Sequence, residues 1–384
     1  MAITLLITDR NMAIQGDPLT GWTNLDVTVN FNAPAAGTVT LPAYPDVMSQ
    51  LVPGNRIVVI RDGAIWTAGP MEEPTNYRWS LDDPGVGVVD VNFSDDLAVV
   101  AGYITWPEPS LTWAGQHGNT YRSFTATNAE TIIRTLVNEN CGPGAIAARR
   151  IPNFVLDTVA GAGTNTAIST RFEALLDVCR SVASAGGGIG FRTRQDGSLI
   201  KFGCYTPSDR SGTARFSTGL GNLRSVAYSQ SAPTVTHALV AGNETTGSTV
   251  RTYVEVADTS ASGAWWRVEA YVDGGADTDS AGELTASGTS QLADGAAPVA
   301  LATVTVDTAE LRAGRDYGLG DLVAVALPHG LQLTDVVRTI HLQATPGDGE
   351  QVSSVIGSQD ATSDPRIVRL VRTLNRRLGR LETR

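Results

Sequence analysis

Residues 53–70, PGNRIVVIRDGAIWTAGP, predict a β-hairpin. Its two apolar runs, Arg56–Arg61 and Ala64–Ala68, flank Asp62-Gly63, and both turn residues tolerate the positive φ angles of a tight hairpin turn. Similar runs, rich in Val, Ile, Thr and Phe, occur on either side, at Ile3–Thr8, Leu25–Phe31, Thr38–Leu41 and Val86–Phe93. Short strands separated by turn residues predict a small barrel or sandwich, and we expect a β-barrel over residues 1–100.

A second copy of this pattern lies toward the C-terminus. Gly320-Asp-Leu-Val-Ala-Val-Ala326 resembles Gly54–Ile60, and each copy is followed by a turn, a second strand, a polar loop and a third strand. From the leading glycine to the final aspartate is 42 residues in the first copy (Gly54 to Asp96) and 40 in the second (Gly320 to Asp360). We therefore expect a related β-barrel over residues 220–363. A Gly-, Ala- and Ser-rich insertion near 274–298 interrupts it and fits either a helix or a loop.

The residues between the two copies predict a domain of another kind. Capping-box patterns at 127–130 and 170–173 are each followed by apolar residues at helical spacing and then by glycine. A hairpin around Asp196-Gly197 comes next. We expect an α+β domain over residues 101–219. The predicted fold is mainly β with an α+β insert: two small antiparallel β-barrels flank the α+β domain, and an amphipathic helix ends the chain.

That last helix, residues 364–384, has a heptad-like seam and a strong positive charge. Seven arginines against Asp364 and Glu382 give it a net charge of +5. The helix could dock on its own domain, self-associate around an axis, or bind a partner. In the last two cases its seam is an intermolecular interface. The seam residues are spaced four, three, four and three apart: Ile367, Val371, Leu374, Leu378 and Leu381.

Composition narrows the class of protein. The chain has 384 residues, of which 42% are hydrophobic and 17% charged, as expected of a folded globular protein. Its net charge is −11, so the part before residue 364 carries −16 (−11 minus +5). An acidic body argues against gripping nucleic-acid phosphates, although DNA could pass along such a surface. No run approaches the roughly 20 apolar residues of a membrane helix, so we expect no membrane insertion.

Motifs that carry catalysis or bind cofactors are missing from the sequence. It contains no P-loop, no G-x-S-x-G, no H-E-x-x-H and no EF-hand loop, and its four histidines are scattered. Adjacent carboxylates such as Asp95-Asp96 are expected on solvated loops. Cys141, Cys179 and Cys204 lie far apart, and we expect buried free thiols. We predict no catalytic, metal or cofactor site and no enzyme activity.

Four tryptophans are candidate contacts for a partner or a glycan. Trp106 and Trp113 bracket an irregular, proline-containing segment, and Trp265 and Trp266 are adjacent in a predicted strand. Neighbouring residues of a strand face opposite sides, so we expect at least one of Trp265 and Trp266 to leave its core. Aromatic side chains on loops can stack on sugars or anchor a protein interface, and plain packing is the alternative.

The order of these regions resembles the hub proteins of phage tail tips and contractile baseplates. It is most similar to the minor tail proteins of long-tailed phages that infect high-GC actinobacteria. The resemblance rests on a barrel, an α+β insert and a second barrel, on the hairpin of residues 53–70, and on Tyr317-Gly-Leu-Gly-Asp-Leu-Val323 before a strand pair.

The resemblance implies a structural role in the virion. It implies a homotrimer that matches a three-fold spike or fibre to the six-fold tail and leaves a path for DNA through the lumen. The implied partners are the distal tail protein ring, a central spike or fibre or another tail-tip protein, and the tape measure protein. The location would be the tail tip, after assembly in the host cytoplasm. Two alternatives are a receptor- or glycan-binding tail protein and, less favoured, a tail-associated cell-wall hydrolase.

Overall fold

The structure is a computed structural model of the chain. It describes residues 3–72, 74, 76–81, 83–230, 232–242, 251–273, 280–296, 299–305, 308, 310–328, 330–347 and 349–357. The predicted C-terminal helix and its seam (Ile367, Val371, Leu374, Leu378 and Leu381) lie outside the described residues.

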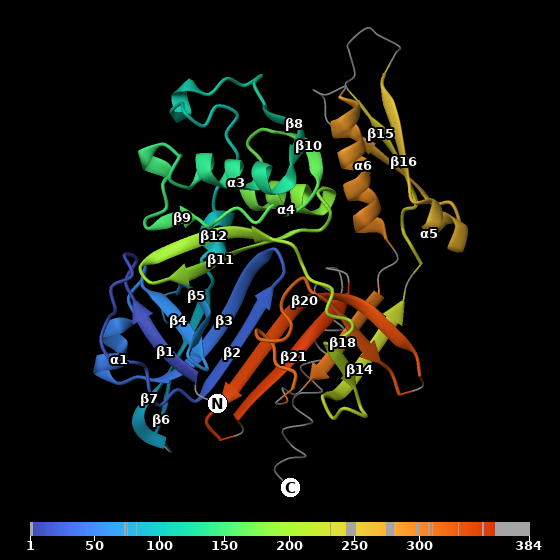
Figure 1. The fold of residues 1–384 in the computed structure, drawn as a ribbon. Coiled ribbons are helices and arrows are strands. Elements are labelled where there is room, and N and C mark those ends of the chain that lie inside the picture. The colour runs from blue at the N-terminus through green and yellow to red at the C-terminus, as the bar shows by residue number, and fades with distance from the viewer. Residues whose placement is uncertain are drawn as a thin grey trace.

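In sequence order, the described chain forms a first β unit, an α+β unit, and a second β unit that carries an inserted lobe. In space the two β units lie side by side, and the α+β unit covers one end of them (Figure 1). The first β unit contains β1 (Ile3–Thr8), β2 (Asn24–Asn30), β3 (Ala33–Pro42), α1 (Pro45–Gln50), β4 (Arg56–Arg61), β5 (Ala64–Pro70), β6 (Asn76–Ser80) and β7 (Asp83–Ser94). The α+β unit contains α2 (Leu97–Ala101), η1 (Trp113–Gly115), β8 (Arg122–Asn128), α3 (Ala129–Asn140), η2 (Ala147–Arg149), β9 (Phe154–Leu156), β10 (Asn165–Thr170), α4 (Leu175–Ala185), β11 (Gly190–Asp196) and β12 (Leu199–Tyr205).

The second β unit contains β13 (Arg215–Ser217), β14 (Leu223–Gln230), β18 (Val299–Thr305), β19 (Leu322–Ala326), β20 (Gln332–Thr345) and β21 (Gly349–Gly357). The inserted lobe contains β15 (His237–Ala241), β16 (Tyr253–Ala257), α5 (Thr259–Ala264), β17 (Glu269–Asp273) and α6 (Ala281–Gly295). Of the two readings of the Gly-, Ala- and Ser-rich insertion, the helix is correct for residues 281–295.

Most strands of the two β units share one sheet, and β1, β4 and β5 of the first unit form a separate three-stranded sheet. Eight strands follow each other in the order β14-β18-β21-β20-β2-β3-β7-β6, with β19 beside β20 and β13 beside β19. The join is the antiparallel pair of β2 with β20, in which Leu25 lies opposite Ala344 and Asn30 opposite Thr339. Within the described residues no sheet closes into a barrel, so the prediction of two separate barrels is not confirmed. Their strands instead merge edge to edge.

The repeat predicted from the sequence is visible in the strand pairing. The first unit pairs β2-β3-β7 and the second pairs β14-β18-β21 in the corresponding order. The hairpin β4–β5 corresponds to β19–β20. Beyond β5, Met71 bridges Phe93 of β7, while in the second unit β20 pairs with β21 from Val337 onward. The two units differ in how firmly the hairpin joins the next strand, because β5 is linked only through the Met71 bridge whereas β20 itself pairs with β21.

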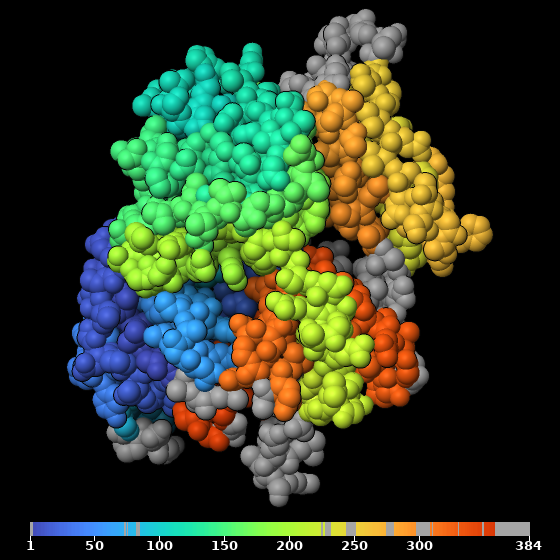
Figure 2. Space-filling model, in the orientation of Figure 1, coloured from blue at the N-terminus to red at the C-terminus, as the bar shows by residue number. Residues whose placement is uncertain are grey.

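The hydrophobic cores follow this division. One core includes residues of both β units, among them Leu25, Val27 and Val91 of the first and Phe216 and Leu342 of the second. The α+β unit has its own core, built on the apolar faces of α3 and α4. The inserted lobe has a small core of Ala238, Val240 and Leu284, and α6 packs it against β10 and α4 (Figure 2).

The starts of α3 and α4 differ from the predicted capping boxes. Asn128, not Thr127, caps α3, since its Oδ1 accepts from the backbone N–H of Thr131. Glu130 is buried, and it accepts hydrogen bonds from the backbone N–H groups of Ala160 and Ala162. No side chain caps α4. The helices were predicted correctly, but both capping boxes were wrong. Glu130 bonds the distant 160–162 segment, and Glu173, which accepts from Thr170 Oγ1, precedes α4 and does not cap it.

Asn32 fastens the first β unit to the α+β unit. It lies at the tip of the β2–β3 hairpin, has φ 55° and is 7% exposed. Its side chain donates to the Ile189 carbonyl and accepts from the Phe191 N–H, over distances of 2.9 and 2.8 Å. Its own carbonyl accepts from Arg180 Nε at 2.9 Å. Asparagine combines tolerance of a left-handed φ with a donor and an acceptor, so it fits this position.

We predict that Asn32→Ala lowers the free energy of unfolding by about 2–4 kcal/mol, because two buried backbone groups lose their partners and alanine must adopt a left-handed φ. Urea unfolding measures this change. Asn32→Gly keeps the backbone conformation and should lose somewhat less. The exposed Asn11→Ala is the control and should change little. Equal stability of Asn32→Ala and the parent protein would contradict this role.

Candidate interaction surfaces and the charge cluster between the β units

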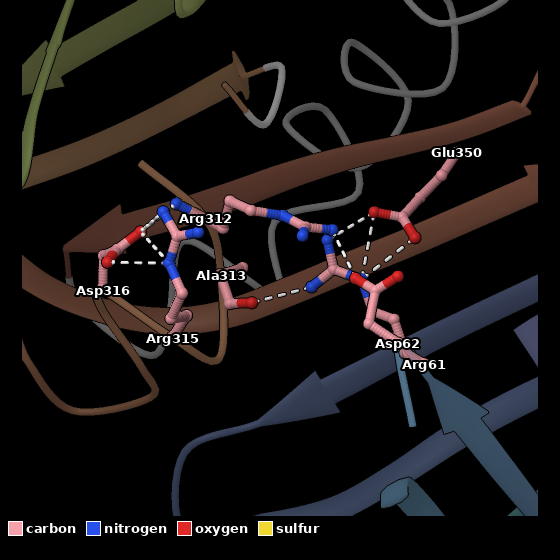
Figure 3. Close-up of polar contacts among 7 residues, drawn as sticks. All are labelled: Arg61, Asp62, Arg312, Ala313, Arg315, Asp316 and Glu350. Carbon is pink, nitrogen blue, oxygen red and sulfur yellow. Dashed lines mark hydrogen bonds and ion pairs between the residues drawn. The ribbon is translucent and has the colours of Figure 1, made fainter. Parts of the chain in front are cut away.

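A buried ion pair joins the two β units. Arg61, at the end of β4, forms an ion pair with Glu350 of β21, and the side chains are 5% and 4% exposed. Arg61 Nε lies 3.0 Å from each Glu350 carboxylate oxygen, and Arg61 Nη1 donates to the Ala313 carbonyl at 2.7 Å (Figure 3). Beside this pair, Arg312 Nη2 lies 2.5 Å from Asp62 Oδ2. These contacts cross between the two copies of the repeat and fix their relative position.

A second buried arginine links the first β unit to the α+β unit. Arg56, at the start of β4, contacts Asp96 through Nη2 and Oδ2 at 2.5 Å, with side-chain exposures of 5% and 2%. Its Nη1 also donates to Gln195 Oε1 of β11 at 2.9 Å. The first residue of β4 therefore contacts the α+β unit, and its last residue contacts the second β unit. In the sequence these two residues appear only as arginines at the two ends of an apolar strand, Arg56 and Arg61, and no role was predicted for either.

Asp95 and Asp96 do not lie on a solvated loop, so that prediction was wrong. They connect β7 to α2, where Asp96 is buried and Asp95 is partly buried. Burial raises the pKa of Asp95 to about 6, and burial also raises the pKa of Asp96 despite the nearby Arg56. Because the folded pKa of Asp95 lies above 3.8, protonation of Asp95 stabilises the fold, and this contribution is lost as the pH rises through about 6.

A pocket of 700 Å³ lies where the two β units meet β11. Arg61 stacks over the Trp66 ring at 4.8 Å on its wall, and Arg192 lies over Tyr205 at 4.9 Å. The other lining arginines contact carboxylates, as Arg315 does Asp316 at 2.8 Å. Since the cations are already matched by acidic groups or rings, the pocket is a polar seam between units and not a basic ligand site.

Trp106 and Trp113 lie in one aromatic cluster in the α+β unit. Trp106 is 7% exposed, and the Arg149 guanidinium lies over its ring at 4.0 Å. Trp113 is 64% exposed, with its ring centroid 5.6 Å from that of Trp106 and 5.9 Å from that of Phe172. Phe172 has φ 56°, a strained conformation for an aromatic residue. Only Trp113 and Phe172 offer substantial surface to a partner.

Trp265 and Trp266 lie apart from this cluster, in the inserted lobe. The prediction that they share a strand was wrong: Trp265 ends α5, and β17 begins only at Glu269. They are 51% and 71% exposed. Both lie in the irregular segment between α5 and β17, and neither is among the described core residues.

The described residues were searched for reactive cysteines and for clusters of metal-binding side chains. Cys141, Cys179 and Cys204 are buried and free, as predicted. Burial raises the pKa of Cys141 and Cys204 to about 12 and also raises the pKa of Cys179 well above its ordinary value, so none is a nucleophile near neutral pH. In the part of the chain that is described, no three His, Cys, Asp or Glu side chains gather to hold a metal ion. No described helix is long and apolar enough to cross a membrane.

We predict that Glu350→Gln lowers the free energy of unfolding by about 3–5 kcal/mol, because it leaves the buried Arg61 charge without its counter-charge. Urea unfolding provides the measurement. The double variant Arg61→Met/Glu350→Leu should recover most of the loss, since it removes both charges. Glu269→Gln, in the exposed pair Arg267–Glu269, is the matched control and should change stability by less than about 1 kcal/mol. A loss of that small size in Glu350→Gln would contradict the account.

Comparison with solved structures supports a tail-protein fold. The 43 kDa tail protein of prophage MuSo2 from Shewanella oneidensis superposes with a TM-score of 0.59 at 14% identity, over 93% of this chain and 99% of that one. A tail protein from Neisseria meningitidis MC58 gives a TM-score of 0.55 at 13% identity, over 93% and 96%. The prophage tail protein gp18 from Listeria monocytogenes EGD-e gives 0.55 at 10% identity, over 98% and 99%.

No curated protein sequence matches the chain. Residues 4–358 do match the sequence family described as Siphovirus ReqiPepy6 Gp37-like protein, and this range holds both β units, the α+β unit and the inserted lobe. The resemblance to phage tail proteins is thereby confirmed, and the match covers nearly all of the chain. The chain belongs to the Siphovirus ReqiPepy6 Gp37-like family and is a tail protein of a phage virion.

Proposed function

We propose that the protein is the structural hub of the phage tail tip and that three copies form a closed ring. The observation that carries this proposal is the repeat: each chain has two similar β units, which are joined through one continuous sheet. Three chains then present six β units around an axis, and such a ring can meet a six-fold tail on one side and a three-fold spike or fibre on the other. The two-fold repeat within each chain would therefore let a three-fold ring match a six-fold tail.

The proposed contacts follow from this arrangement. The ring would bind the distal tail protein ring, a central spike or fibre or another tail-tip protein, and the tape measure protein, with DNA only passing through the lumen. The acidic body, at −16, repels phosphates and suits a channel that DNA must not adhere to. We propose no enzymatic activity, no cofactor and no membrane insertion. Assembly would take place in the host cytoplasm.

Residues 364–384 would lie at the centre of the ring or on a neighbouring tail protein. Their seam (Ile367, Val371, Leu374, Leu378 and Leu381) spans only about two and a half heptads, so it would be marginal alone and needs the ring to hold it. The Arg-rich surface outside the seam is opposite in charge to the body and can pair with acidic surfaces of adjacent copies.

A receptor- or glycan-binding tail protein is the second candidate. Trp113 favours it, because its ring is largely exposed and a strained Phe172 holds it on one side. Strained residues often mark binding sites. Here Trp113→Ala should abolish binding to cell-wall glycan fragments on an array, while the equally exposed Trp266→Ala should not. Absence of glycan binding by the parent protein would remove this candidate.

The ring is tested by the solution mass of the purified full chain, measured by light scattering. We expect a trimer of about three times 40.3 kDa. If the seam holds the trimer together, a version that ends at Ser363 and the variant Leu374→Arg should each dissociate at a higher protein concentration than the parent protein. A monomer at every concentration would contradict the ring, and an unchanged trimer in Leu374→Arg would exclude the seam as its contact.

A further inference from the structure

The three-stranded sheet of the inserted lobe has one covered face and one exposed face. Its strands lie in the order β16-β15-β17, and α6 packs on one side of them. The packing is close, because a Cβ added at Gly288 of α6 would lie 2.5 Å from Val256 and 3.0 Å from Val240. Since α6 also contacts β10 and α4, it lies between this sheet and the α+β unit (Figure 1). Every second residue of β16 and β17 is exposed, so the opposite face of the sheet is turned outward.

The centre of the exposed face is apolar. Leu239 of the middle strand lies opposite Glu255 on one side and Tyr271 on the other, and residues opposite each other in a sheet point to the same face. Leu239, Tyr253 and Tyr271 are 42%, 53% and 58% exposed. The Tyr271 hydroxyl accepts a hydrogen bond of 2.8 Å from Arg251 Nη1, so its ring is the part left to a partner. An exposed leucine between exposed rings, with a polar rim, is typical of an interaction surface.

The rim of this face is acidic. Arg267 Nη2 lies 2.7 Å from Glu255 Oε1, and its Nε lies 2.5 Å from Glu269 Oε1. Arg251 Nη2 lies 2.6 Å from Asp273 Oδ1. Two arginines thus serve three carboxylates that remain about half exposed or more, and exposed pairs of this kind contribute little energy, so the carboxylates can accept a further cation. We call this surface the lobe face, and it consists of Leu239, Tyr253, Glu255, Glu269, Tyr271 and Asp273.

Residues 364–384, which we call the basic segment, match the lobe face in charge and in length. The basic segment carries +5, while lobe residues 232–298 hold nine acidic and two basic residues, a net charge of −7. Surfaces of such opposite charge attract each other. As a helix, the seam from Ile367 to Leu381 spans about 21 Å, close to the roughly 17 Å length of a five-residue strand such as β15. The apolar seam can therefore lie along the apolar centre while its arginines reach the rim.

The described part of the chain ends close to the lobe. Gly357, the last described residue, lies opposite Ala300 of β18, the strand that directly follows the lobe. The Gly357 carbonyl accepts from Arg338 Nε at 2.8 Å, and Arg338 lines one cavity together with Ala293 of α6. The six residues 358–363 can span roughly 20 Å when extended. The basic segment therefore begins within reach of the lobe.

We propose that the lobe face is the docking surface for the basic segment of this chain. The seam packs on Leu239 and the two tyrosine rings, and the arginines beside the seam pair with the carboxylates of the rim. Because the basic segment is tethered next to the lobe, the docking requires little intrinsic affinity. The inference goes beyond the proposed function, since docking does not require a ring. Within the ring, it names the acidic surface on which the basic segment lies.

Photo-cross-linking of the full-length protein tests the docking. Tyr253 is replaced by p-benzoylphenylalanine, which keeps an aromatic ring on the lobe face, and the irradiated protein is digested for mass spectrometry. We expect cross-links from position 253 to residues 364–384. The same replacement of Tyr77, a similarly exposed tyrosine on β6, is the control and should not reach these residues. Absence of the expected cross-links, or an equal yield of them from position 77, would overturn the proposal.

A substitution at the centre of the lobe face tests its role directly. In the protein that carries the photoreactive group at position 253, Leu239→Arg places a positive charge against the basic segment and should lower the yield of these cross-links at least about fivefold. Leu331→Arg changes a leucine of nearly equal exposure beside β20 and should leave the yield unchanged. Circular dichroism checks that both variants fold. Equal yields in the two variants would contradict docking on the lobe face.

A mixture of isotopically labelled and unlabelled protein assigns the docked segment to a copy. Cross-links within one isotope class only place the basic segment on the lobe of its own copy, and cross-links between classes place it on the lobe of an adjacent copy. Both assignments support the docking. The solution mass of the parent protein reports on the ring independently, so a failure of the docking and a failure of the proposed ring are distinguishable.

Discussion

The antiparallel pairing of β2 with β20 is the constraint on which the rest of the molecule depends. It brings together Asn30 and Thr339, which are 309 positions apart, and their side chains share a hydrogen bond of 3.1 Å. On the other side of β2 lies β3, and on the other side of β20 lies β21, so this one pair turns two repeats into one sheet. Because the sheet is shared, the apolar faces of both units form one core. A contact so distant in sequence is costly to close, and the buried Arg61–Glu350 pair holds the same join through a second route.

This join explains where the other parts of the chain are attached. In the first unit β2 and β3 are linked by the short turn at Phe31 and Asn32, whereas the inserted lobe occupies the corresponding link between β14 and β18. The α+β unit lies between β7 and β13 and is fastened to the frame by Asn32 and Arg56. The shared sheet, which is fixed by backbone pairing, can carry the α+β unit and the inserted lobe without a change in its own geometry. The exposed aromatic residues Trp113 and Trp266 lie on these additions.

Much of the local structure could be predicted from the sequence. The β4–β5 and β11–β12 hairpins follow from Asp62-Gly63 and Asp196-Gly197, since few residues accept the turn conformation. The repeat, the α+β region and the buried cysteines were also predictable from pattern. Strand partners were not. Alternation of apolar residues shows which face of a strand is buried but carries no information on its neighbour, so strands merged in one sheet were interpreted as two barrels.

The candidate site was harder to predict than the fold. The first capping box was wrong because Glu130 bonds a distant loop, and the second because Glu173 bonds Thr170 before α4 begins. Asp95-Asp96 were interpreted as solvated because adjacent acids usually are. The strand assigned to Trp265-Trp266 was wrong because a short helix, α5, takes up part of that run. Buried charges such as Arg61 and Glu350 cannot be paired from one sequence, since 289 positions separate them.

The most direct test of this account is an electron cryomicroscopy reconstruction of the intact tail tip of a phage that carries this protein. We expect three copies in a closed ring directly below the tail tube, with their six β units arranged around a central channel. Density that placed the chain as a peripheral appendage outside the tail axis, or in any number of copies that does not form a three-fold ring, would contradict it.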